Sequence, residues 1–320
     1  MGRARDGLAQ DGRAQDERVT ASTVPTPASP PREPGRVRIG SAGFSYPDWV
    51  GPVYPPGKRG GHPLARLASY VDLLEVNVSY YRIPAPRTAT AWLEKTADRE
   101  DFRFTAKLWR GFTHGPERAT KRDLAAMKAF LEALGADGRL IAALAQFPPT
   151  LQATPRAQAY VHRLAEHVEG VPLAVEFRDA SWDRDDVREA LSRRGISWVV
   201  GDLLPLPRGL EPRPLATTDL AYLRLHGRNP AWAERGAERD RRYDWLYDEA
   251  DVRRFADWVA TLRARAREVL VVANNHFEGK ALVNALELKA AVLRARVDVP
   301  GTLLTAYPRL AAVANPSRAS

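Results

Sequence analysis

The chain has 320 residues, 44% of them hydrophobic, and this proportion excludes a chain that is disordered throughout because it can bury a large core. It contains no cysteine, which excludes disulfides, thiolate zinc sites, iron–sulfur clusters and cysteine nucleophiles, and which agrees with a reducing compartment. The net charge is +9, but only 7 of the 48 basic residues are lysines, so a genomic preference for arginine explains the excess more simply than phosphate binding does.

Residues 1–35 predict a disordered leader. Its second half, TASTVPTPASPPREPG (20–35), mixes Pro, Ser, Thr and Ala and has no hydrophobic cluster to bury. Neither this leader nor any later stretch has an apolar run long enough for a signal peptide or a membrane span. We therefore expect a cytoplasmic protein without a membrane partner and with one folded domain over residues 36–320.

From Val37 onward, short apolar runs alternate with amphipathic stretches, a pattern that is typical of parallel βα units. The predicted strands are 37–43, 73–78, 102–108, 140–147, 173–178, 197–202, 221–227 and 269–275. The predicted helices include 64–71, 88–97, 121–135, 157–170, 184–195 and 252–266, and 279–296 supplies the helix of the eighth unit.

Eight such repeats favour closure into a TIM-type (β/α)8 barrel, with an open doubly wound sheet as the alternative. No GxGxxG fingerprint opens a helix after the first strand, so a nucleotide site of the Rossmann type is not expected. We expect no bound cofactor.

Polar residues follow the predicted strands at their C-terminal ends, where the active sites of TIM barrels lie. Eight of these residues form four pairs two apart, a spacing that places both side chains on one strand face: Glu75/Asn77, Glu176/Arg178, Arg224/His226 and Asn274/His276. The predicted result is a ring of charges and amides at the barrel mouth. The same charges could instead form ion pairs that close this end of the barrel.

Several motifs in order, SAGFSYPDW, LLEVNVSYYRIP, FRFTAKL, LAQFPP, VEFRDASW, RLHGR and NNHFEGKALVNA, resemble the YecE-like family (domain of unknown function 72) from about Val37 to Leu286. The resemblance implies a TIM barrel but no settled activity. The family-typical positions it carries over include Tyr46, Trp49, Glu75, Asn77, Tyr81, Lys107, His114, Gln146, Glu176, Arg178, Asp202, Arg224, His226, Asn274 and Asn275.

The first functional hypothesis is an enzyme, of hydrolase, lyase or isomerase type, that acts on a small anionic or sugar-like substrate. Glu75, Glu176, His226 and Asp202 are its candidate proton-transfer residues, and the other residues of the ring would bind substrate. Arg228 and Lys280, in the loops after strands seven and eight, could hold a phosphate. The barrel glycosidases are disfavoured, because Gln146 and His226 stand where those enzymes place carboxylates.

Two alternatives remain open. Glu75, Glu176, Asp202, His114, His226 and His276 could serve a metal-dependent enzyme similar to endonuclease four or xylose isomerase, although Arg178 and Arg224 would repel the cation. A basic mouth with aromatic side chains could also bind nucleic acid without catalysis. The aromatic-rich segment 229–251 could then act as a lid or simply pack on the barrel. The sequence leaves the oligomeric state undecided.

Overall fold

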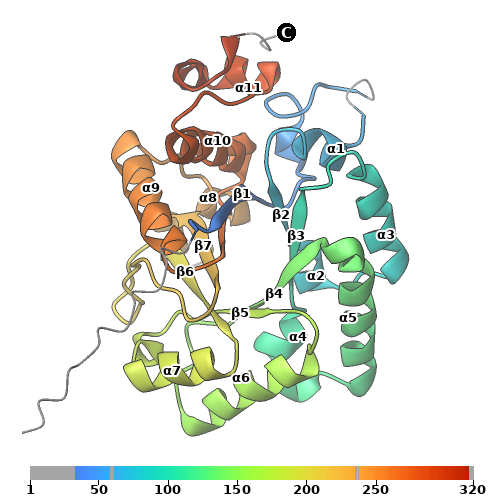
Figure 1. The fold of residues 1–320 in the computed structure, drawn as a ribbon, viewed down its shortest axis with the longest axis vertical. Helices are drawn as coiled ribbons and strands as arrows, with labels where there is room; N and C mark the ends of the chain where they lie inside the picture. The colour runs from blue at the N-terminus through green and yellow to red at the C-terminus, as the bar shows by residue number, and fades with distance from the viewer. Residues whose placement is uncertain (1–32, 58–60, 235, 237, 317–320) are drawn as a thin grey trace, which may run out of the picture. The chain divides into compact units, whose positions relative to one another are not determined.

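Eight parallel strands form a closed barrel in the computed structural model, each hydrogen-bonded to the next in chain order, with β8 against β1 (Figure 1). The structure describes residues 33–57, 61–234, 236 and 238–316. The strands are β1 Arg36–Ala42, β2 Leu73–Val76, β3 Arg103–Lys107, β4 Leu140–Gln146, β5 Leu173–Glu176, β6 Ser197–Leu203, β7 Leu220–Gly227 and β8 Glu268–Ala273.

The predicted TIM-type barrel is confirmed, and the pairing of β1 with β8 rules out the open doubly wound sheet. Every predicted strand overlaps an observed one, and the ends differ by two residues at most. The largest differences occur where Asn77, Arg178 and Asn274 leave the ladder. At these positions the chain turns into the loops that build the barrel mouth.

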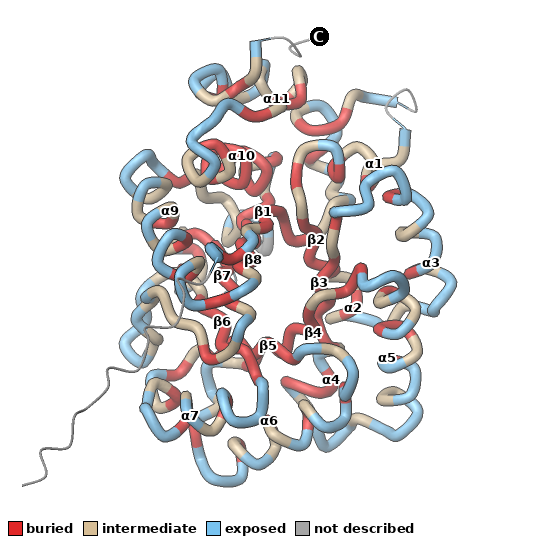
Figure 2. The backbone as a smooth tube through the Cα atoms, viewed as in Figure 1, coloured by how far each residue is buried: buried red, intermediate tan, exposed pale blue. Residues whose placement is uncertain are grey.

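Helices surround the barrel, with their buried sides against the strands and their outer sides exposed (Figure 2). Side-chain caps fix the start of several of them; Thr120 and Asp123 form a reciprocal capping box at the start of α5. The α-helices are α1 Pro63–Leu67, α2 Val78–Tyr81, α3 Pro86–Lys95, α4 Arg110–Thr113, α5 Lys121–Leu134, α6 Pro155–His167, α7 Asp185–Arg193, α8 Arg239–Arg242, α9 Glu249–Arg263, α10 Lys280–Leu293 and α11 Gly301–Ala306.

The expected alternation of strand and helix fails in one place, between β6 and β7. Residues 204–219 form no helix there, because prolines recur through the segment, and proline removes a backbone donor and clashes with the preceding turn. These prolines are Pro205, Pro207, Pro212 and Pro214. The barrel is therefore covered at β6 by extended chain instead of a helix.

Apolar side chains form two separate layers on the two faces of the strands. The outer layer fills the space between strands and helices, and the inner layer fills the barrel with aliphatic residues around Tyr222. Gly40 permits one close contact in this wall, since a Cβ atom there would lie 1.7 Å from the carbonyl oxygen of Leu73. The inner layer consists of Ala42, Leu73, Ala142, Leu144, Ala174, Val199, Tyr222, Leu270 and Val272.

Most of the leader expected at residues 1–35 lies outside the described residues. Its last residue, Gly35, is already fixed to the barrel, because its N–H donates to the carbonyl oxygen of Arg263 over 2.9 Å. From Glu33 onward the described residues form one compact unit. None of the helices in the described part of the chain is both long and apolar enough to cross a membrane.

Candidate functional site

The inner face of the barrel carries most of the predicted site residues at its C-terminal end. On several strands, the residue two positions after the inner apolar layer lies on the same face and is polar. Leu73 is followed in this way by Glu75, Ala174 by Glu176 and Tyr222 by Arg224. The cluster defined by these inner residues, called the inner cluster below, comprises Glu75, Lys107, Gln146, Glu176, Arg178, Tyr222, Arg224, His226 and Asn274.

Arg224 stands at the centre of this cluster and joins both buried glutamates. Its Nη2 donates to Glu75 Oε1 over 2.6 Å, and its Nε donates to Glu75 Oε2 over 2.8 Å. Its Nη1 donates to Glu176 Oε2. All three side chains are 0% exposed, so the ion pairs are withdrawn from solvent and each partner depends on the others.

Glu176 is held by two further side chains. Arg178 donates to Oε1 from Nε over 3.0 Å and from Nη2 over 2.6 Å, and His226 Nε2 lies 3.2 Å from the same oxygen. Burial raises the pKa of Glu176, but the charges of Arg224 and Arg178 and the hydrogen bond from His226 together outweigh it and hold that pKa well below its usual range. Glu176 is therefore an ionised, saturated carboxylate.

His226 is a neutral member of the cluster. Burial, reinforced by the charge of Arg224, lowers its pKa to about 4 despite the opposing effect of Glu176. The Asn274 amide nitrogen lies 3.0 Å from His226 Nδ1, which as an acceptor leaves the ring proton on Nε2, facing Glu176. Asn77 continues the chain outward, with its amide nitrogen 3.5 Å from Asn274 Oδ1.

Lys107 differs from the other cations of the cluster because its partner is an amide. Its Nζ donates to Gln146 Oε1 over 2.7 Å and lies 4.4 Å from the centre of the Tyr80 ring. It forms no ion pair with a carboxylate of the described residues. Burial, together with the charge of Arg224, lowers the pKa of this amine to about 7.

Tyr222 is part of the site although the strand-end pattern does not indicate it. Its hydroxyl donates to Glu75 Oε2 over 2.7 Å and lies 2.8 Å from the Thr105 hydroxyl, beneath the ion pairs. The signal in the sequence is its position two residues before Arg224, which gives it the same strand face. An inward-facing tyrosine in a barrel core needs such a polar partner.

Asp202, predicted to be a proton-transfer residue, faces the outside of the barrel. It accepts from Arg228 Nη2 over 2.7 Å and from the Tyr247 hydroxyl over 2.7 Å, between β6 and helix α9. Arg228, which was expected to hold a phosphate, also donates to Asp251 over 3.0 Å and is therefore paired with two carboxylates. Asp202, Arg228, Tyr247 and Asp251 form the outer cluster, which is separate from the inner one.

The remaining loop residues take different places. Trp49 is fully buried and donates to the carbonyl oxygen of His276 over 2.7 Å, so it joins two loops and does not line the mouth. Lys280 donates to Asp244 over 2.5 Å, so a carboxylate occupies this second cation expected to hold phosphate. Asn275 faces outward and donates to the carbonyl oxygen of Trp245.

Three predicted binding residues do reach the mouth. The Tyr46 ring stacks on His276 at 4.0 Å between centroids, and Gly43 makes room for it with a φ of 76°. Tyr81 is 51% exposed at the end of α2. His114 Nε2 lies 3.3 Å from the Tyr80 hydroxyl, and burial lowers the pKa of this histidine.

Aromatic side chains of the segment between β7 and α9 pack on residues at the C-terminal end of the barrel. Tyr243 stacks on His276 with 4.5 Å between centroids, and Trp232 lies 5.9 Å from the Arg178 guanidinium. Trp245 packs against Gly227, whose φ of 80° and missing side chain permit the contact. The aromatic side chains therefore fix this segment to the barrel end.

Two grooves lead to the edges of the inner cluster. One, of about 610 Å³, runs between the loops after β1 and β2 and is lined by Tyr46, Asn77 and Tyr81. The other, of about 540 Å³, runs between the loops after β4, β5 and β6 and is lined by Gln152, Arg178 and Arg208 among others.

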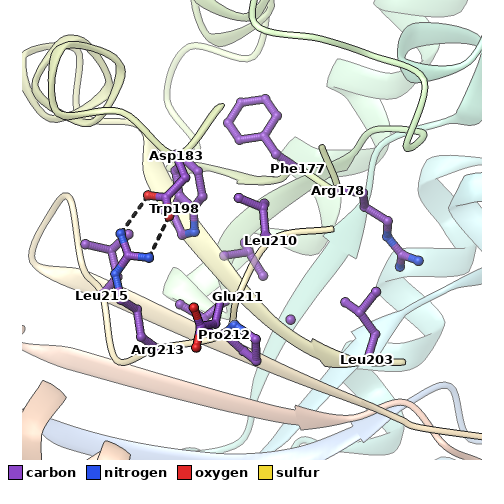
Figure 3. Close-up of a pocket in the computed structure, with 13 residues that line it drawn as sticks. Phe177, Arg178, Asp183, Trp198, Leu203, Leu210, Glu211, Pro212, Arg213 and Leu215 are labelled. Carbon is purple, nitrogen blue, oxygen red and sulfur yellow. Dashed lines mark hydrogen bonds and ion pairs between the residues drawn. The ribbon is translucent and has the colours of Figure 1, made fainter. Parts of the chain in front are cut away.

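A third and smaller cavity marks a gap in the barrel wall. Strands β5 and β6 are paired only at Ala174↔Ser197 and Val175↔Trp198, and above this point they separate. Figure 3 shows Phe177 and Trp198 on one side of the cavity and Arg178 on the other, pointing away from the Asp183–Arg213 ion pair. Its volume of about 20 Å³ is enough for roughly one water molecule.

Comparisons with known proteins agree with this architecture. The model of the family described as "Protein of unknown function DUF72" matches residues 38–307. The chain belongs to the DUF72 family. It is 27% identical over 268 residues to the UPF0759 protein YunF of Bacillus subtilis, which covers 79% of this chain and 93% of that protein.

Two solved DUF72 structures have the same fold. A DUF72 family protein from Thermotoga maritima is 37% identical, with a TM-score of 0.73 over 80% of this chain and 99% of the other. A DUF72 family protein from Enterococcus faecalis is 25% identical, with a TM-score of 0.72 over 81% of this chain and 96% of the other. The DUF72 match encloses every candidate site residue from Tyr46 to Lys280 but assigns no activity to any of them.

The metal-dependent alternative has no ready donor set in the described part of this DUF72 chain. No group of three or more His, Asp or Glu side chains is placed there to hold a metal ion. The candidate ligands are instead distributed: Glu75 and Glu176 bind Arg224, Asp202 binds Arg228, and His276 lies between aromatic rings.

Proposed function

We propose that this chain is an enzyme that binds a small anionic substrate at the C-terminal end of the barrel and moves a proton there. The observation that carries the proposal is the charge balance of the inner cluster. When Lys107 is protonated, three cations, Lys107, Arg178 and Arg224, meet two carboxylates. An anionic group of the substrate would supply the missing negative charge.

The hydrogen bonds indicate where that anion would bind. Arg224 donates to both glutamates through all three of its nitrogens. Arg178 donates to Glu176 only through Nε and Nη2, and it lines the second groove. Lys107 gives one hydrogen bond to Gln146. Arg178 and Lys107 therefore retain N–H groups for a carboxylate or phosphate, in a site of low dielectric where such contacts are strong.

The residue best suited to proton transfer is Lys107 rather than either glutamate. Glu75 and Glu176 accept from arginine on both of their oxygens and are fully buried. A general acid or base works best when its pKa lies near the operating pH, and the pKa of Lys107 is about 7. The glutamates then serve to fix Arg224 and Arg178 and to set the field around the amine.

A small anion fits these contacts better than nucleic acid does. Binding to nucleic acid needs an open basic surface with several free cations. Here Arg228 and Lys280, at the same end of the barrel, are already paired with Asp202 and Asp244. Lys107 and Arg178, whose N–H groups remain for an anion, are largely buried, which suits a small ligand better than a polymer.

The test is thermal unfolding of the full chain with inorganic phosphate, pyruvate and short dicarboxylates at constant ionic strength. An anion at 100 times its Kd stabilises the folded state by about 2.7 kcal/mol. We expect Lys107→Met and Arg178→Met to lose this stabilisation and Lys280→Met, the matched control at the same barrel end, to keep it. The proposal is wrong if no anion stabilises the parent chain beyond chloride, or if Lys107→Met responds as the parent does.

A further inference from the structure

Lys107 stands out among the lysines whose contacts are described. Lys280 and Lys289 donate to the carboxylates of Asp244 and Asp72 over 2.5 and 2.7 Å. Lys107 is 8% exposed and donates to the amide oxygen of Gln146 instead. An amide oxygen orients the amine without a charge to stabilise the ammonium form.

The identity of this residue is informative in a chain that uses arginine almost everywhere. The sequence has 41 arginines and 7 lysines. An arginine at position 107 would bind an anion through more donors, but its guanidinium does not lose a proton in proteins. A lysine beside Arg224 and Arg178 offers an anion fewer donors than an arginine would, but its amine can lose a proton.

The surroundings of the amine suit a nucleophile. Desolvation and neighbouring cations are the two means by which enzymes activate a lysine amine, and burial plus the charges of Arg224 and Arg178 supply both here. Tyr80 lies beside the amine, and its hydroxyl is 3.3 Å from His114 at the solvent edge. This pair offers a route for the protons that an addition to a carbonyl group requires.

We propose that Lys107 is a nucleophilic amine that forms an imine with a small carbonyl compound carrying a carboxylate or phosphate group. This inference rests on the proposed function, because Arg178 would bind the anionic group. The neutral Nζ adds to the carbonyl carbon and loses one of its two protons, and the carbonyl oxygen takes up a proton to become the hydroxyl of a carbinolamine. The hydroxyl then takes up a second proton and leaves as water as the carbon–oxygen bond breaks, the nitrogen loses its remaining proton, and a carbon–nitrogen double bond remains.

The test is reductive trapping on the full chain. The protein is incubated with sodium cyanoborohydride and either pyruvate or dihydroxyacetone phosphate, and peptide mass spectrometry locates the reduced adduct. Uncharged dihydroxyacetone is the control for the anionic group. Lys107→Arg keeps the charge but cannot form an imine, and Lys280→Arg removes a lysine at the same barrel end whose amine is already paired.

We expect the adduct on Lys107 to exceed that on each of the other lysines by on the order of tenfold at neutral pH, where an ordinary lysine amine is almost fully protonated. The adduct should disappear in Lys107→Arg, persist in Lys280→Arg and be weak with dihydroxyacetone. Labelling spread evenly over the lysines with both anionic carbonyls would overturn the inference.

The two proposals fail in different ways. If phosphate stabilises the parent but not Lys107→Met, and yet neither carbonyl compound is trapped on Lys107, the anion site stands and the imine is wrong. If no anion stabilises the parent and no adduct forms, both proposals are wrong. An adduct on Lys107 that forms equally well with dihydroxyacetone would contradict the role of Arg178 in binding an anionic group.

Discussion

Two buried clusters of arginine and carboxylate lie at the same end of this barrel, on opposite faces of its wall. In the inner cluster, Arg224 is 0% exposed and joins Glu75 and Glu176. In the outer cluster, Arg228 joins Asp202 and Asp251, but its side chain is 24% exposed. The difference shows that similar ion pairs can have different roles. The outer ion pairs join α9 to the barrel and remain accessible to water. The inner ion pairs are closed to water.

The same comparison separates the carboxylates by charge state. Burial raises the pKa of Asp202 despite its contacts with Arg228 and Tyr247. The charges of Arg224 and Arg178, together with the hydrogen bond from His226, instead hold the pKa of Glu176 well below its usual range. Glu176 therefore carries a fixed negative charge at the barrel mouth. This charge pairs with Arg178 and acts on the nearby Lys107.

The largest effect is expected from breaking the inner cluster at its centre. Arg224→Met leaves two buried carboxylates without their shared cation, so the free energy of unfolding should fall by about 3–5 kcal/mol in urea titrations. The control is Arg208→Met, since Arg208 is 67% exposed in its pair with Asp179 and should cost less than about 1 kcal/mol.

A triple variant sharpens this prediction. Adding Glu75→Gln and Glu176→Gln to Arg224→Met removes the stranded charges, so much of the lost stability should return. If the triple variant is as unstable as the three single losses added together, the charges do not act as one unit.

A smaller effect is expected from pH, through His226. Its folded pKa of about 4 lies below the usual value near 6.5, so the unfolded chain binds the proton more tightly between these limits. The unfolding free energy should therefore fall as pH decreases from about 6.5 to about 4, with a contribution from His226 on the order of 3 kcal/mol. His226→Gln should flatten this slope relative to the parent.

Urea titrations at a series of pH values measure the difference. The other histidines titrate in both chains and cancel in the comparison. An identical slope in parent and variant would contradict a neutral, buried His226.

The smallest effect is expected in the outer cluster. Asp202→Asn keeps the shape of the side chain, and Arg228 retains Asp251, so we expect a loss of about 2 kcal/mol. Tyr247→Phe removes the hydroxyl that donates to Asp202, and the double variant should lose less than the sum of the two single variants. Stabilisation by anions should stay unchanged in all three, and its loss would connect the outer cluster with the site.

The sequence alone predicted the barrel, because eight apolar runs separated by amphipathic stretches have few other ways to bury both strand faces. It also predicted most of the inner cluster, since residues two apart, such as Glu176 and Arg178, share a face whatever the exact register. The strand and helix alternation did not predict that the helix after β6 is missing, although the prolines of 204–219 account for it.

The tertiary structure alone decided which face each polar residue takes in strands that are apolar on both sides. In β6, SWVVGDL, alternation does not reveal whether Asp202 or its neighbours point inward, and the closed barrel turns it outward. The tertiary structure also determined the partners: whether Lys107 would contact Gln146 or a glutamate depended on the register of the neighbouring strands β3 and β4 and on the positions of the strands that carry the glutamates. The two-residue period of a strand determines which residues share a face. The charged partner of each residue depends on strands that are far apart in the sequence and that only the tertiary structure brings together.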